Sequence, residues 1–224
     1  MGLGEELVQV LDLAGADKIW RPVYDQDNNL LFDGVADPRE ATREELIQVD
    51  FQDKTVVDLG CNTGWFTFLA KDLGARFVVG IDLDPHLIRG CELLQQINRC
   101  ENVAFVTGDF TSPDMPAPHD IGLMISFLGR SKIQQGIAPF LDALERVSRK
   151  VMITSARHFY RIRKHLAGDS EGLTRLYGRD YIDGDYFLLL NYIRDYYRDR
   201  WDMTVISPQY DDESFKNTMM FVRK

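Results

Sequence analysis

The chain has 224 residues, of which 45% are apolar and 27% charged, and its formal net charge at pH 7 is -9. This length suits one domain with a full hydrophobic core, and the acidic balance excludes a surface built as a whole to lie on nucleic acid. The three cysteines show no C-x-x-C spacing, so neither a disulfide framework nor a zinc site is expected.

The first 50 residues predict an N-terminal extension of helices and a hairpin. Residues 5–14 carry apolar side chains at helical spacing behind acidic residues, which predicts an amphipathic helix. Residues 23–32 have a turn-forming centre between apolar flanks, typical of a hairpin or tight loop. Pro38, followed by good helix formers, predicts a second helix over about residues 38–49.

From residue 54 onward, apolar runs alternate with amphipathic segments, which predicts a parallel sheet covered by helices on both faces. The expected strands are 54–59, 77–82, 102–109, 120–127 and 151–156, and the expected helices are 64–74, 85–100 and 134–150. Residues 202–208 and 218–224 are joined by only a short link and should form an antiparallel pair. We therefore predict a single α/β domain over residues 1–224, doubly wound, with a seven-stranded, mostly parallel sheet and a C-terminal antiparallel hairpin.

The stretch "VVDLGCNTGWF", residues 56–66, joins the first of these strands to a helix through a glycine-containing bend. Such a bend lies at the carboxyl edge of a parallel sheet, where open α/β folds bind ligands. Glycine allows a ligand to approach the backbone closely. A dinucleotide fingerprint counted from Gly60 would need glycine at Asn62 and Trp65, and a P-loop would need lysine after Gly64, so neither pattern fits.

This stretch resembles the first motif of the class I S-adenosylmethionine-dependent methyltransferases. The similarity continues in order through "VVGIDLDP", "VAFVTGDF" and "HDIGLMISF" and covers about residues 38–156. It implies a Rossmann-like fold, S-adenosyl-L-methionine as cofactor and a methyltransferase activity. The chain departs from the family's commonest form at Asn62, where glycine is usual. Asparagine tolerates a left-handed backbone better than most residues do, so the same loop is expected.

The resemblance also assigns roles to residues. Asp58 and the backbone from Gly60 to Gly64 would surround the methionine part of the cofactor, Asp82 would accept both ribose hydroxyls, and Asp109 would face the adenine amino group. The cofactor residues that it implies are Asp58, Gly60, Cys61, Asn62, Gly64, Asp82, Leu83, Asp109, Phe110 and Ser126. A structural alternative for Asp82 is an N-cap ahead of Pro85, for which Asp84 is the better candidate.

Residues 157–200 form a segment longer than one helix connecting two strands would require, and it is rich in arginine and tyrosine. We interpret them as an insertion or lid between the fifth and sixth strands. Arg157, His158 and Tyr160 come directly after the fifth strand and are candidates for substrate binding. The alternatives are a solvated helix and, for His158, a structural role, so no general base is assigned. The apolar periodicity after residue 187 favours a packing helix, and its tyrosines and arginines are compatible with a homodimer.

The segment after the fourth strand narrows the choice of methyl acceptor. It reads "SFLGRSK" and has neither the Asn/Asp-Pro-Pro-aromatic motif of adenine and glutamine methylation nor a nucleophilic cysteine. The remaining acceptors are an oxygen or nitrogen of a small molecule, or of a tRNA or other RNA base. Methylation of a protein group is a further alternative. The alternatives to an active enzyme of this family are a non-catalytic partner subunit with the same fold and a Rossmann-type oxidoreductase.

The sequence also predicts where the chain works. No secretory leader pattern opens it, and no apolar run approaches the roughly 18 residues of a membrane-spanning helix. We expect a cytoplasmic chain with reduced cysteines, no membrane association and no bound metal.

Overall fold

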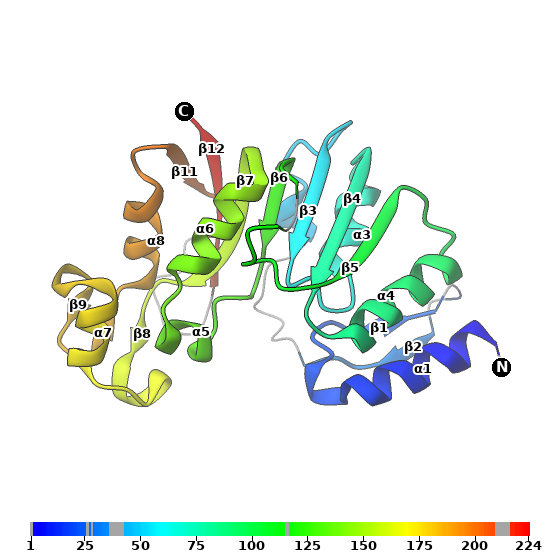
Figure 1. Cartoon of the computed structure of the whole chain (residues 1–224), viewed down its shortest axis with the longest axis horizontal. Coiled ribbons are helices and arrows are strands. Elements are labelled where there is room, and N and C mark those ends of the chain that lie inside the picture. The colour runs from blue at the N-terminus through cyan, green and yellow to red at the C-terminus, as the bar shows by residue number, and fades with distance from the viewer. Residues whose placement is uncertain (1, 26, 28, 36–42, 115–116, 209–215) are drawn as a thin grey trace.

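A computed structural model describes residues 2–25, 27, 29–35, 43–114, 117–208 and 216–224. Its centre is a seven-stranded sheet in the order β11-β12-β7-β6-β3-β4-β5 (Figure 1). The strands are β3 (Thr55–Leu59), β4 (Phe77–Asp82), β5 (Val103–Thr107), β6 (His119–Met124), β7 (Ser148–Arg157), β11 (Trp201–Val205) and β12 (Lys216–Arg223). The five strands from β7 to β5 are parallel, and β12 is antiparallel to both β7 and β11. The predicted fold class is confirmed.

Helices cover both faces of this sheet because successive strand residues point to opposite sides. Val56 of β3 packs in one buried cluster with α3 (Trp65–Asp72), whereas Val57 packs in another with α6 (Ala138–Val147) and α8 (Leu189–Tyr197). The helices α1 and α4 share a third cluster and lie side by side (Figure 1). The helices are α1 (Leu3–Ala14), α2 (Arg43–Leu46), α3 (Trp65–Asp72), α4 (Pro85–Ile97), α5 (Arg130–Gln135), α6 (Ala138–Val147), α7 (Ser170–Tyr177) and α8 (Leu189–Tyr197), with short 3-10 turns η1 (Ala16–Lys18) and η3 (Arg179–Tyr181).

The N-terminal extension agrees with its prediction where it is described. The first helix runs over Leu3–Ala14, and β1 (Val23–Tyr24) pairs with β2 (Leu30–Phe32) as an antiparallel hairpin. The second helix appears as the short α2, while the part of its predicted range before residue 43 lies outside the described residues.

One predicted helix, residues 134–150, is divided in the structure. Gly136 has φ +97°, a conformation that interrupts a helix, and it separates α5 from α6. At the other end, Ser148 already belongs to β7, and its hydroxyl donates to the carbonyl of Leu144 at 2.6 Å. The helical pattern of the sequence was right, but helix begins earlier, at Arg130, and ends earlier, at Val147, than predicted.

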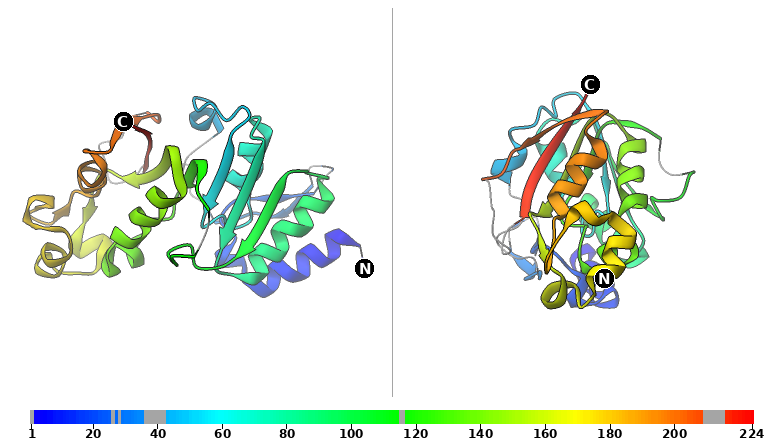
Figure 2. Two further views of the ribbon diagram at one scale, coloured as in Figure 1. Left: turned by 45° about the horizontal axis from the view of Figure 1, so that its top comes forward. Right: turned by 90° about the vertical axis from the view of Figure 1, so that its left-hand side faces the viewer.

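Residues 157–200 gather at the end of the molecule opposite α1 and the hairpin (Figures 1 and 2). They form a small antiparallel sheet of β8 (Tyr160–Arg161), β10 (Tyr186–Phe187) and β9 (Ile182–Asp183), a π-helix (Ile162–Leu166), α7 and α8. The alternative of a solvated helix after β7 is confirmed in part, because the π-helix buries Ile162 and exposes Arg163 and Lys164, whereas Tyr160 and Arg161 belong to a strand. The predicted packing helix is confirmed as α8, whose Leu190 and Ile193 are buried. Tyr197, one of the tyrosines considered for a subunit contact, is buried as well, and its hydroxyl donates to the carbonyl of Leu141 at 2.7 Å. No helix in the described part of the chain is long and apolar enough to cross a membrane.

Candidate functional site

The bend between β3 and α3 has left-handed backbone at three positions. Gly60, Asn62 and Gly64 have φ of 73°, 53° and 78°. At Gly60 a Cβ atom would also stand 2.6 Å from the ring of Phe127, so both conformation and space require glycine there. Asn62 adopts the left-handed conformation that its residue type tolerates. The composition of the bend is therefore explained by its geometry.

A cavity of about 1080 Å³ lies beside this bend. It is larger than the roughly 300–1,000 Å³ of typical small-molecule pockets. Five of the residues predicted from the sequence line it: Gly60, Asn62, Asp82, Leu83 and Ser126. Leu83 is 60% exposed and offers apolar surface to this hollow. The structure thus brings the bend and the carboxyl ends of β4 and β6 to one site.

Asp82 ends β4 with its carboxylate fixed by two backbone amides. The amide of Asn62 donates to Oδ2 at 2.9 Å, and the amide of Asp84 donates to Oδ1 at 3.1 Å. A carboxylate oxygen accepts more than one hydrogen bond, so each oxygen keeps capacity for a further donor. Asp82 thereby presents two fixed acceptor oxygens at the cavity.

Asp84 performs the structural role that the sequence predicted for it. Its Oδ1 accepts from the amide of His86 at 2.9 Å and caps α4, while Oδ2 pairs with Nζ of Lys18 at 2.8 Å. Burial acts to raise the pKa of Asp84, but the hydrogen bonds from Lys18 and His86 outweigh it and hold the pKa below its usual value. The two aspartates of "DLDP" thus have different partners.

Asp58 is buried beneath the bend rather than in the cavity lining. Its Oδ2 accepts from the hydroxyl of Thr67 on α3 at 2.7 Å, and only 1% of the residue is exposed. Burial raises the pKa of Asp58 to about 7, against the lowering effect of the Thr67 hydrogen bond. Its observed contact therefore joins β3 to α3.

Four other predicted cofactor residues do not line this cavity. Cys61 is buried with its thiol directed to the carbonyl of Asn62, and Gly64 is the N-cap of α3. Asp109 is exposed and accepts from the amide and hydroxyl of Thr111, which lowers its pKa. Phe110 is buried in the core, with its ring centroid 5.1 Å from that of Phe127. For Phe110, core packing is the observed role.

The residues proposed for substrate binding do not line the cavity either. Tyr160 is 6% exposed, and the guanidinium of Arg157 lies 5.3 Å from the centroid of its ring. The ring of His158 stands edge-on to Phe159 at 5.9 Å. Arg157 is the last residue of β7, and His158 and Tyr160 follow it outside the cavity lining.

Sequence reasoning missed two walls of the cavity. Asp17, Lys18 and Trp20 reach it from the N-terminal extension, and Ser131 and Lys132 reach it from α5. No local pattern marks the first group, because its place depends on contacts with residues more than 40 positions away. The second group comes soon after β6 in the chain, and that adjacency was a usable signal.

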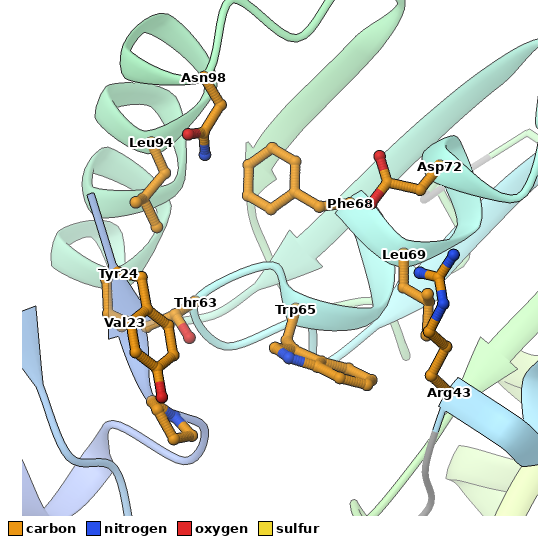
Figure 3. A pocket seen from close by; sticks show the side chains of 11 residues that line it. Val23, Tyr24, Arg43, Thr63, Trp65, Phe68, Leu69, Asp72, Leu94 and Asn98 are labelled. Atoms are coloured by element: carbon orange, nitrogen blue, oxygen red, sulfur yellow. The ribbon is translucent and has the colours of Figure 1, made fainter. Parts of the chain in front are cut away.

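A smaller cavity of about 350 Å³ lies on the other side of the bend (Figure 3). Thr63 lines it, whereas the neighbouring Asn62 lines the larger one. Phe68 of α3 and Leu94 of α4 face each other across it (Figure 3). Arg21 stands 4.8 Å above the ring of Trp65 beside it. None of the predicted site residues lines this hollow. Among the described residues, no group of three or more His, Cys, Asp or Glu side chains is arranged to hold a metal ion.

Sequence comparison identifies a match that includes the bend. The model of a family described as "Methyltransferase domain" matches residues 50–170, slightly more than half of the chain. Ribosomal protein L11 methyltransferase of Pasteurella multocida is 39% identical over 107 residues, covering 44% of this chain and 35% of the relative. That of Psychrobacter arcticus is 32% identical over 105 residues, covering 44% and 33%. The chain thus spans about a third of the length of these curated relatives.

Structural comparison supports the same architecture. The N-terminal domain of EvdMO1, crystallised in the presence of S-adenosylhomocysteine and D-fucose, gives a TM-score of 0.65 at 14% identity and covers 100% of this chain and 98% of that one. Magnesium protoporphyrin IX methyltransferase from Synechocystis PCC 6803, with bound S-adenosylhomocysteine, gives 0.53 at 17% identity and covers 78% and 76%. At these identities the likeness establishes the fold.

Proposed function

The chain belongs to the methyltransferase-domain family of class I S-adenosylmethionine-dependent enzymes, and on that premise we propose that it transfers the cofactor's methyl group to an oxygen or nitrogen of an acceptor molecule. When bound, the cofactor supplies a methyl group activated by the positive sulfonium. The chain's own task is then to bind, orient and exclude water, and positioning alone can contribute roughly 7–11 kcal/mol to a transfer step.

The observation that carries this proposal is the carboxylate of Asp82 at the cavity, beside the left-handed bend that begins at Gly60. Two amides hold that carboxylate at the end of β4, where a ribose diol would find two acceptor atoms. Gly60 lets the ring of Phe127 lie against the bend at the cavity, and the exposed Leu83 offers a surface for a flat apolar ring. These features fit the adenosine part of the cofactor.

For the acceptor we favour a small molecule over a tRNA or other RNA base. The net charge of -9 disfavours a phosphate backbone, and the arginine-rich segment after β7 lies outside the cavity lining. The cavity is large enough for a second small molecule. The ribosomal protein named for the relatives is their acceptor, and this chain spans only about a third of their length.

Transfer of radiolabelled methyl from S-adenosylmethionine tests this activity. The protein is incubated with small-molecule, RNA and protein fractions of a cell extract, with Asp82→Ala as the matched inactive control. We expect label in the small-molecule fraction with the native chain only. Label in the RNA fraction or the protein fraction would identify that class of molecule as the acceptor instead. Binding of the cofactor without label in any fraction would favour the non-catalytic subunit instead.

A further inference from the structure

Asn62 holds a strap, residues 16–20, at the edge of the cavity. We propose that Asn62 is a positioning residue that determines cofactor affinity through this strap, and in particular through Trp20, instead of by contact with the cofactor. The inference rests on the proposed function, because cofactor affinity is its readout. It assigns a reason for asparagine at a position where the family's commonest motif has glycine.

Both polar atoms of the Asn62 side chain form hydrogen bonds with the backbone of the strap. Its Nδ2 donates to the carbonyl of Lys18 at 2.7 Å, and its Oδ1 accepts from the amide of Trp20 at 2.9 Å. These bonds join segments more than 40 residues apart. Beside them, Nζ of Lys18 pairs with Asp84 at 2.8 Å. The strap is therefore fastened to the bend and to the start of α4.

The backbone of Asn62 has a separate role that glycine would preserve. Its amide donates to Asp82 at 2.9 Å, and its φ of 53° suits glycine as well as asparagine. An Asn62→Gly variant thus retains the bend and the orientation of Asp82 and loses only the two bonds to the strap. Few substitutions separate the two functions so cleanly.

Trp20 is the large side chain that this strap presents at the cavity. It lines the hollow and is 37% exposed, and a bound molecule would cover apolar surface there. Because the polar atoms of the Asn62 side chain are engaged with the strap, the loss of that side chain should act by releasing Trp20. The two residues should then behave as one unit in binding.

Calorimetric titration with S-adenosylhomocysteine tests this through a double-mutant cycle. We expect Asn62→Gly to weaken binding by about tenfold, the effect of two lost hydrogen bonds, and Trp20→Ala to weaken it similarly. The double variant should be little worse than either single one. Asn102→Gly is the matched control, because Asn102 is an exposed asparagine with φ 60° away from the cavity.

Hydrogen exchange at the Trp20 amide supplies the second readout. Its exchange should accelerate in Asn62→Gly and stay unchanged in Asn102→Gly. Unaltered affinity in Asn62→Gly, or a double variant in which the two losses multiply, would overturn the role assigned to Asn62. Failure of the native chain to bind S-adenosylhomocysteine would contradict the proposed function itself. That result is distinct from native binding that Asn62→Gly leaves unchanged, which would contradict only the role of Asn62.

Discussion

Replacing Asp82 by alanine is expected to remove measurable binding of S-adenosylmethionine, a loss of at least about a hundredfold. Two hydrogen bonds from the ribose hydroxyls to a carboxylate would be lost, each contributing on the order of 1.5–3 kcal/mol. The amides of Asn62 and Asp84 would also lose their acceptor, so the bend beside the cavity would be less well fixed. Titration calorimetry measures the effect.

The matched control for this variant is Asp183→Ala. Asp183 is an exposed aspartate on β9, far along the chain from the cavity lining. It should bind the cofactor as the native chain does, and both variants should keep the native circular dichroism spectrum. Equal affinity of Asp82→Ala and the native chain would contradict the assignment of the ribose site.

Asp58→Asn is expected to stabilise the protein at pH 8 and to flatten part of its pH dependence. The pKa of buried Asp58 is raised to about 7, against roughly 3.9 in an unfolded chain. Between these values the folded state retains a proton that the unfolded state has lost, so stability falls as pH rises and the full cost is reached above pH 7. At about 1.4 kcal/mol for each pKa unit, the cost is on the order of a few kcal/mol.

Asp120→Asn supplies a control of opposite sign. Hydrogen bonds from Thr55 and an ion pair with Lys150 lower the pKa of Asp120, so its stabilisation is present above the unfolded pKa and is lost as pH falls. We expect Asp120→Asn to destabilise the protein at pH 8, where Asp58→Asn stabilises it. Urea unfolding from pH 4 to pH 8 measures both. The same sign for both variants at pH 8 would contradict this assignment.

Much of the fold was readable because strand and helix periodicities are local. The β4 strand was located at its observed bounds from "FVVGID", and Asp84 was recognised as a cap from its place before Pro85. The bend was identified because glycine and asparagine at Gly60, Asn62 and Gly64 point to left-handed backbone. In each case the residue type and its immediate neighbours determine the conformation.

The features that could not be predicted from the sequence depend on contacts between residues that are distant along the chain. Trp20 lines the cavity, and its amide donates to Asn62, a residue 42 positions further along the chain. Phe110, which the resemblance places among the cofactor residues, packs in the core beside Phe127 because that environment is apolar. Arg157 and Tyr160 pair with each other at the end of β7, outside the cavity lining. Their roles in substrate binding stay predictions.

Thermal unfolding with S-adenosylhomocysteine, compared with NAD, tests the central claim most directly. A ligand at a hundred times its dissociation constant stabilises the folded state by about 2.7 kcal/mol, which for a chain of this size raises the melting temperature by roughly 5–10 °C. We predict such a rise with S-adenosylhomocysteine and none with NAD. A rise with NAD alone would indicate an oxidoreductase, and no rise with either ligand would contradict a cofactor site beside Gly60.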